Sequence, residues 1–390
     1  MKKDPLYKQI KKSESIGLLC NHTGWNATTG LYTFQLLTAT GKLKIVFIPE
    51  HGLFGELQDQ LKLDDTAVYT SLSKQLNWVS LYNSSTHTLT ATKEQLASID
   101  TLIIDIQDAG CRYYTFTSTV YLLLEKISQL QLDIKIIVLD KPNPAGRNVE
   151  GTRMTTPFAS FIGLTGLPHR HGLTMAELCR YFKHRLKGKW ELIIYPIRKK
   201  EYVFIAPSPN IPSEDVCKIY SGQCLWEGTN ISEGRGTTLP FETIGSPFLQ
   251  WVFEENWNES NHPVFDKGCQ IRPTRFIPVF HKYSNETCSG LHLILRDKKK
   301  YHSLAHSLRL MQYIREKTPA FEWRKGAYEA FNEKTAIELL AGDRLLLDYL
   351  EHKASWKEVT QKLEEEENAW IREVSSFLVY KPTLQTLKLN

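Results

Sequence analysis

The sequence predicts an α/β protein in which a Rossmann-like parallel-sheet domain is followed by a smaller C-terminal α+β domain. In the first half of the chain, short β-branched apolar runs alternate with amphipathic stretches of helix length. Near residue 271 this pattern gives way to strand-like segments followed by helices. The length of 390 residues also exceeds the size at which one hydrophobic core usually stops growing. We therefore predict a Rossmann-like catalytic domain over residues 1–270 and an α+β auxiliary domain over residues 271–390.

Each predicted strand of the first domain is a short run of mainly apolar residues. The predicted strands cover residues 16–20, 44–49, 101–106, 135–139 and 192–197. Helices are predicted at residues 33–38, 117–130 and 174–186, and the last opens with the capping-box pair Thr174 and Glu177. In the second domain we expect strands at 275–280 and 290–295, a helix near 303–315, and an amphipathic helix or helix pair at 355–378.

Composition narrows the classes of function. The net charge of +5 is mild and the basic residues are scattered, so no nucleic-acid partner is expected. No apolar run is long enough to cross a bilayer, so no membrane association is expected either. The seven cysteines form no C-x-x-C pair, which favours free thiols over a zinc or disulfide framework. The charged N-terminus resembles no export signal, so we expect a cytoplasmic protein, or a periplasmic or secreted one if the N-terminus has been trimmed.

Polar residues follow the ends of several predicted strands, where loops of a parallel sheet converge on one crevice. They are Asn21, Glu50, His51, Asp108, Asp140 and Asn143. Glu50 follows a proline and is neither a common helix cap nor a common turn residue, so we assign it a chemical role. We favour a site role for Asp108, whereas Asp140 fits turn formation as well as it fits a site.

Two further segments contain candidate site residues. Residues 206–248 are interpreted as a long ligand-covering loop, in which Glu227, Asn230 and Arg235 offer the hydrogen-bonding groups that a polyhydroxylated ligand requires. Residues 168–172 precede the capped helix, whose N-terminus is suited to receive an anion. Histidines in this segment and at position 51 permit a metal site, but no specific metal-binding spacing is present, and we expect no metal and no cofactor.

Familiar motifs for other chemistries are missing. The sequence contains no dinucleotide-binding G-x-G-x-x-G after the first strand, no phosphate-binding G-x-x-x-x-G-K-[ST], and no G-x-S-x-G nucleophile elbow. A crevice rich in carboxylates, amides, aromatic rings and arginines remains. That inventory suits glycoside hydrolysis, in which one carboxylic acid protonates the leaving oxygen and a second group stabilises or attacks the oxocarbenium-like centre.

At these residues the sequence resembles the exo-β-N-acetylmuramidase family of bacterial peptidoglycan turnover. The matching segments are Pro49-Glu50-His51-Gly52, Asp105-x-Gln107-Asp108-x-Gly110-x-Arg112-x-Tyr114-Thr115, Leu139-Asp140-x-Pro142-Asn143-Pro144, Arg170-His171-Gly172-x-Thr174, Pro207-Ser208-Pro209-Asn210, Glu227-Gly228-Thr229-Asn230-x-Ser232-x-Gly234-Arg235-Gly236-Thr237 and Pro240-Phe241-Glu242. The resemblance implies an active site between the two domains and hydrolysis of β-1,4-linked N-acetylmuramic acid at the non-reducing end of peptidoglycan fragments. It implies a peptidoglycan-derived oligosaccharide or muropeptide as partner, and Glu50 as the leading catalytic acid.

From position and chemistry we add Asp108 and Glu227 as the choices for the second catalytic group. The predicted substrate-binding residues are Asn21, His51, Arg112, Tyr114, Asp140, Asn143, Arg170, His171, Asn210, Asn230 and Arg235. Arg112, Arg170 and Arg235 are the candidates for the lactyl carboxylate of muramic acid, and Arg170 is preferred because it lies beside the capped helix. Two alternatives stay open: a non-catalytic muropeptide-binding protein, and a metal-dependent hydrolase using His51, His169 and His171.

Overall fold

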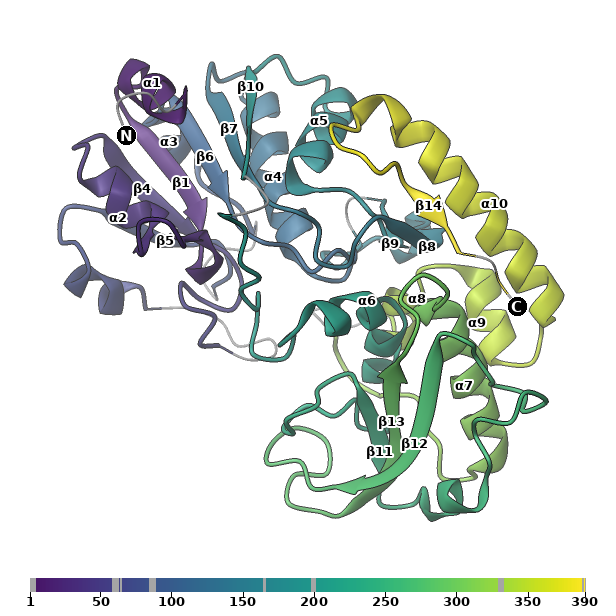
Figure 1. Cartoon of the computed structure of the whole chain (residues 1–390). Helices are drawn as coiled ribbons and strands as arrows, with labels where there is room; N and C mark the ends of the chain where they lie inside the picture. The colour runs from purple at the N-terminus through teal and green to yellow at the C-terminus, as the bar shows by residue number, and fades with distance from the viewer. Residues whose placement is uncertain are drawn as a thin grey trace.

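The first half of the chain forms a six-stranded sheet with the order β10-β7-β6-β1-β4-β5 (Figure 1). The computed structural model describes residues 5–57, 63, 65–83, 89–163, 166–197, 201–328, 333–387 and 389. Every pairing in this sheet is parallel. The strands are β1 (Ile16–Cys20), β4 (Leu43–Ile48), β5 (Asn77–Ser80), β6 (Thr101–Asp105), β7 (Lys135–Asp140) and β10 (Leu192–Pro196). The predicted Rossmann-like fold class is confirmed, and the five predicted strands lie within two residues of the observed ones.

Helices cover both faces of this sheet, which explains why its strands are apolar without alternation. Leu19 and Ile104 belong to a buried cluster that also contains residues of α3, α4 and α5. Their neighbours Leu18 and Ile103 belong to a second cluster, with residues of α1 and α2. These helices are α1 (Pro5–Lys12), α2 (Thr33–Thr38), α3 (Lys93–Ala97), α4 (Phe116–Gln129) and α5 (Met175–Arg185).

The second half of the chain builds a three-stranded antiparallel sheet with the order β11-β13-β12, visible in green in Figure 1. Its strands are β11 (Thr243–Ser246), β12 (Cys269–Phe276) and β13 (Cys288–Leu295), and its helices are α6 (Glu214–Gln223), α7 (Ser303–Lys317), α8 (Ala336–Ala341) and α9 (Arg344–Leu350). The sheet therefore takes one strand from the chain before residue 270.

Two predictions fail in this region. The strand expected at 275–280 is β12, which begins at Cys269 and ends at Phe276. It ends there because Pro278 lacks a backbone N–H and restricts the conformation of the residue before it. The expected loop at 206–248 instead contains α6 and β11. The side chain of Ser213 caps α6 by accepting a hydrogen bond from the backbone N–H of Val216. This helix-start signal was overlooked because the residues before it are typical of turns.

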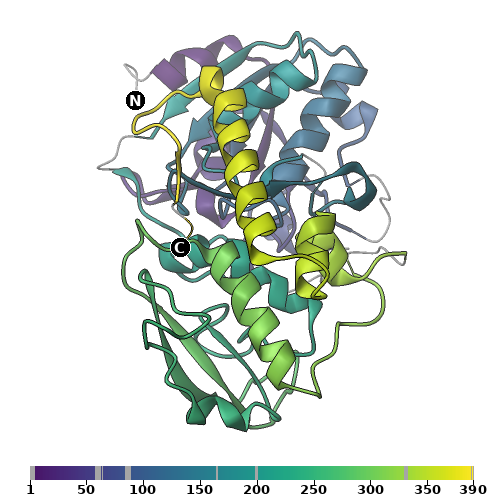
Figure 2. The same cartoon turned by 90° about the vertical axis from the view of Figure 1, so that its right-hand side faces the viewer.

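A long helix joins the two halves. Figure 2 shows α10 (Trp356–Val374) running along the molecule from the side of α9 to the region of α5. Beyond it, β14 (Gln385–Thr386) pairs with β8 (Asn148–Arg153), which also pairs with β9 (Pro168–Arg170). Within α10, the side chain of Glu367 is fully buried. Across the residues described above, no helix combines the length and apolarity needed to span a membrane.

The remaining elements are short. β2 (Trp25–Asn26) pairs with β3 (Leu31–Tyr32). Single 3₁₀ turns lie at His22–Gly24, Ala67–Ser71, Thr156–Phe158, Cys224–Gly228, Gln250–Glu254 and Ser375–Phe377. The turn Cys224–Gly228 matters for function because it carries Glu227.

Candidate active site

A narrow pocket lies between the loop after β4, the loop before α4 and the segment that follows α6. Six predicted site residues line it: Glu50, His51, Tyr114, Asn210, Glu227 and Arg235. They come from segments up to 185 residues apart (50 to 235), so the fold brings together groups that the sequence keeps separate.

Glu50 follows the end of β4, and its side chain is buried in the pocket wall. Thr115 donates a short hydrogen bond from Oγ1 to Oε2 of Glu50. The next two residues, His51 and Gly52, have φ values of 74° and 85°, a left-handed turn that costs energy for histidine. Burial, and then the charge of Arg235, lower the pKa of His51 to about 4, so its ring is neutral near pH 7.

The carboxylate of Glu227 is held by a cation and a hydroxyl group. Its Oε1 accepts a hydrogen bond from Nη2 of Arg235 at 2.7 Å, and its Oε2 accepts one from the Tyr328 hydroxyl at 2.7 Å. Burial by itself would raise the pKa of Glu227, but the charge of Arg235 and these hydrogen bonds outweigh it and hold the pKa below its usual value. Glu227 therefore remains a carboxylate at neutral pH.

A second carboxylate, that of Glu233, also forms an ion pair with Arg235. Nε of Arg235 lies 3.4 Å from Oε1 of Glu233, and Lys282 donates a hydrogen bond to Oε2 of Glu233 at 2.9 Å. The two glutamates raise the pKa of Arg235 well above its usual value, despite its burial. The guanidinium also packs over the ring of Phe241, at 5.1 Å from its centroid. Arg235 is thus a fixed positive charge whose position determines that of the Glu227 carboxylate.

Aromatic rings and one amide complete the pocket. Tyr114, Tyr220 and Phe241 line the pocket. Tyr114 packs edge to face on Phe116 with centroids 4.6 Å apart, and Tyr220 packs in the same way on Phe241 at 4.8 Å. The side-chain nitrogen of Asn210 is buried and has no hydrogen-bond partner in the described part of the chain. A pocket with ring faces, fixed carboxylates and an unpaired amide donor suits a sugar, whose faces are apolar and whose rim is polar.

Arg112 lies outside the pocket lining. Its guanidinium is fully buried and donates hydrogen bonds to the carbonyl oxygens of Thr152, Leu340 and Ala341. Two of these oxygens belong to the last turn of α8, where a cation satisfies unpaired carbonyls and the helix dipole. Arg112 therefore joins the two halves of the molecule and does not line the pocket.

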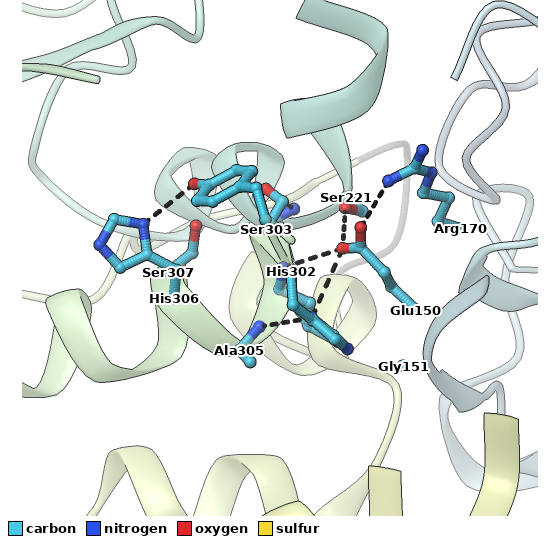
Figure 3. Close-up of polar contacts among 12 residues, drawn as sticks. Glu150, Gly151, Arg170, Ser221, His302, Ser303, Ala305, His306 and Ser307 are labelled. Atoms are coloured by element: carbon cyan, nitrogen blue, oxygen red, sulfur yellow. Dashed lines mark hydrogen bonds and ion pairs between the residues drawn. The ribbon is translucent and has the colours of Figure 1, made fainter. Parts of the chain in front are cut away.

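Arg170, the preferred reader of the lactyl group, also points away from the pocket. Figure 3 shows its guanidinium facing Glu150, with Nη1 2.6 Å from Oε1. The other oxygen of Glu150 accepts a hydrogen bond from the Ser221 hydroxyl at 2.8 Å and lies 3.6 Å from the ring of His302. These residues form a buried polar cluster between β8, β9, α6 and α7.

Asp108 and His171 bond to each other outside the pocket lining. Leu173 donates its backbone N–H to Nδ1 of His171, so the proton of the neutral ring lies on Nε2, which is 3.2 Å from Oδ2 of Asp108. The same carboxylate oxygen accepts the backbone N–H of Gly110 at 2.6 Å. Asp108 thereby fixes the loop that leads to Tyr114.

The other predicted polar residues also bond to nearby backbone. Asp140 accepts the N–H of Ala176 at 2.8 Å, so the helix N-terminus that was expected to receive an anion already holds this carboxylate. The remaining contacts are Asn143 to the carbonyl of Leu173, Asn21 to the N–H of Thr23, and Asn230 to the carbonyl of Ala320. None of these four residues lines the pocket.

The three histidines of the metal hypothesis lie in separate environments. Their rings contact the carbonyl of Leu57, the carbonyl of Thr152 and the carboxylate of Asp108, for His51, His169 and His171 respectively. Within the described ranges, no group of three or more His, Cys, Asp or Glu side chains is placed to hold a metal ion.

Comparisons with known proteins fit this geometry. Residues 16–215 match the family model "Exo-beta-N-acetylmuramidase NamZ, N-terminal", and residues 218–380 match the corresponding C-terminal model. The chain belongs to the exo-β-N-acetylmuramidase NamZ family. It is 32% identical over 390 residues to the peptidoglycan β-N-acetylmuramidase NamZ of Bacillus subtilis, a match that covers 96% of this chain and 89% of the relative.

Two solved structures share the fold. Both are DUF1343 family proteins from Bacteroides fragilis. One is 23% identical, with a TM-score of 0.78 and coverage of 96% of this chain and 97% of that chain. The other is 24% identical, with a TM-score of 0.72 and coverage of 96% of both chains. At this identity the likeness shows the fold alone.

The pocket of this NamZ-family chain takes residues from both family segments. Glu50 and Asn210 belong to the first, and Glu227, Arg235 and Tyr328 to the second. The two segments meet between residues 215 and 218, inside α6, whereas the boundary at residue 270 stays a prediction.

Sequence reasoning missed several lining residues. Thr115, Ser208 and Phe241 stand inside the matching segments but were not selected, because a hydroxyl or a ring alone does not signal chemistry. Tyr328 lies between α7 and α8, in a stretch with no motif. Only the fold shows that its hydroxyl reaches Glu227.

Proposed function

We propose that this protein is an exo-β-N-acetylmuramidase that hydrolyses the β-1,4 bond of N-acetylmuramic acid at the non-reducing end of peptidoglycan fragments. Membership of the NamZ family and the likeness to the Bacillus subtilis enzyme support the reaction class. The observation that carries the proposal is a pair of buried glutamates on one pocket, of which Glu50 accepts a hydrogen bond from Thr115 and Glu227 accepts one from Arg235.

Glycoside hydrolysis needs one carboxyl group that donates a proton and one negative group that faces the sugar. Glu227 takes the second role, since Arg235 and Tyr328 keep it ionised and held in place. Glu50 takes the first role. Its side chain is buried in the pocket wall, and the Thr115 hydroxyl holds its Oε2 in place.

The proposed sequence of events uses these positions. Glu50 gives its proton to the glycosidic oxygen as the bond to the anomeric carbon breaks. Positive charge then develops on the ring, and the fixed carboxylate of Glu227 stabilises it, because a preorganised charge in a buried site needs no rearrangement. Water ends the reaction by adding to the anomeric carbon, and Glu50 takes back a proton.

Incubation with a defined disaccharide tests the proposal. The substrate carries N-acetylmuramic acid at the non-reducing end, β-1,4-linked to N-acetylglucosamine, and the products are identified by mass spectrometry. We expect equal amounts of the two free sugars. An isomer with the two sugars in the opposite order serves as the matched control and should remain intact. Failure to cleave the first disaccharide, or cleavage of both isomers at similar rates, would overturn the proposal.

A further inference from the structure

A second depression adjoins the active pocket. Asn210 lines both, so the two depressions share a wall. The lining of the second one includes Phe276, Ile277, Val279 and Phe280, at the end of β12 and in the turn that follows.

The apolar residues of this depression are unusually open to solvent. Val279 is 70% exposed and Ile277 is 55% exposed, although both are β-branched and apolar. Pro209 and the hydroxyl-bearing Thr237 and Thr238 also line the depression. An exposed apolar surface of this kind, beside a site and edged with polar groups, is typical of a binding surface.

The surface is held rigidly to the active pocket. Val279 donates its backbone N–H to the carbonyl of Gly236 at 2.9 Å, and Lys282 and Tyr283 bond to the segment that carries Glu227. Gly236 has φ of 80°, and a Cβ there would lie 2.6 Å from the carbonyl oxygen of Phe280, so only glycine permits this approach. The depression is therefore preformed next to Arg235.

The lining also indicates the charge of its occupant. Among the described residues that line this depression, none carries a charged side chain. A muramic acid unit carries a carboxylate, and its stem peptide carries more, whereas N-acetylglucosamine is neutral. Apolar walls with a hydroxyl and amide rim match a neutral pyranose, which presents an apolar C–H face and a polar edge.

We infer that this depression, formed by Phe276, Ile277, Val279 and Phe280 with Thr237 and Thr238, binds the N-acetylglucosamine unit of the leaving group. The inference rests on the proposed function, because an exo-acting enzyme holds the terminal sugar in the inner pocket and the next sugar at its mouth. The unpaired amide nitrogen of Asn210 then lies at the junction of the two sugars, where a polar atom of the linkage or of either ring accepts its hydrogen bond.

Two substrates that differ only in the leaving group test this subsite. One is the disaccharide with N-acetylglucosamine as leaving group, and the other is the methyl β-glycoside of N-acetylmuramic acid, which leaves the depression empty. The variant Ile277→Ser with Val279→Ser removes the apolar wall without changing charge. We expect kcat/KM for the disaccharide to fall about tenfold or more, and kcat/KM for the methyl glycoside to stay within about twofold.

The matched control is Val68→Ser, since Val68 is 63% exposed and lines neither depression. It should leave both values of kcat/KM unchanged. Because all three side chains are exposed, thermal unfolding should match that of the unaltered protein. If the unaltered protein hydrolyses both substrates and the double variant preserves their ratio, the subsite is overturned and the proposed function stands. If the unaltered protein hydrolyses neither substrate, both are overturned.

Discussion

Replacing Tyr328 by phenylalanine removes its hydrogen bond to the Glu227 carboxylate and keeps the ring in place. A hydrogen bond to a charged group is worth about 1.5–3 kcal/mol, the upper end of which would correspond to about a hundredfold in rate. Tyr328 holds the carboxylate in the ground state as well as in the transition state, so only part of this energy is lost from the barrier. We expect kcat/KM to fall about tenfold at neutral pH, where Arg235 still keeps Glu227 ionised.

The pH dependence gives the sharper result. Because the pKa of Glu227 lies below its usual value, activity is retained as the pH falls through the ordinary glutamate range and is lost only below it. The hydroxyl of Tyr328 is one of the groups that lower this pKa, so Tyr328→Phe raises the pKa and moves the acid limb of kcat/KM to higher pH. Tyr181→Phe is the control, since it removes a similar hydrogen bond to Glu373 outside the pocket. An unmoved acid limb in Tyr328→Phe would refute the role of Glu227.

Two further substitutions separate catalysis from stability. Arg235→Gln removes the largest influence that lowers the pKa of Glu227, so the acid limb should move further than in Tyr328→Phe; a smaller shift, measured over the same pH range, would contradict the assignment. Arg170→Met leaves Glu150 buried without its cation, so the free energy of unfolding in urea should fall by about 3–5 kcal/mol. The substrate preference of Arg170→Met should not change, and a selective loss of muramic acid cleavage at normal stability would restore Arg170 as the lactyl reader.

Most of the sheet could be predicted because its strands are short apolar runs that can be recognised in the sequence. A parallel sheet covered on both faces needs runs of buried apolar residues, and β1, β4, β6 and β7 supply them. β5 was missed because Asn77 and Ser80 flank only two apolar residues in this short edge strand. Glu50 and Glu227 were both predicted as site residues, and the structure places them on one pocket; their catalytic roles stay a proposal.

The roles of the arginines could not be predicted. Arg112, Arg170 and Arg235 all lie within two residues of a glycine in the sequence, and the capped helix beside Arg170 wrongly favoured it over the other two. Only the tertiary contacts show that backbone carbonyls surround Arg112, that Glu150 neutralises Arg170, and that Arg235 alone lines the pocket. Contacts between residues more than a hundred positions apart, such as that between Tyr328 and Glu227, leave no periodic trace in a single sequence.

The division of labour between the two glutamates is tested most directly with a leaving group that needs no proton. Glu50→Gln and Glu227→Gln are each assayed on the disaccharide and on a dinitrophenyl β-glycoside of N-acetylmuramic acid, whose phenolate departs unaided. Glu50→Gln should lose roughly 10²-fold or more in turnover of the disaccharide and remain close to the unaltered protein on the dinitrophenyl glycoside. Glu227→Gln should lose activity on both substrates. Equal losses on the two substrates for Glu50→Gln, or rescue of Glu227→Gln by the dinitrophenyl group, would contradict the assignment of Glu50 as the acid.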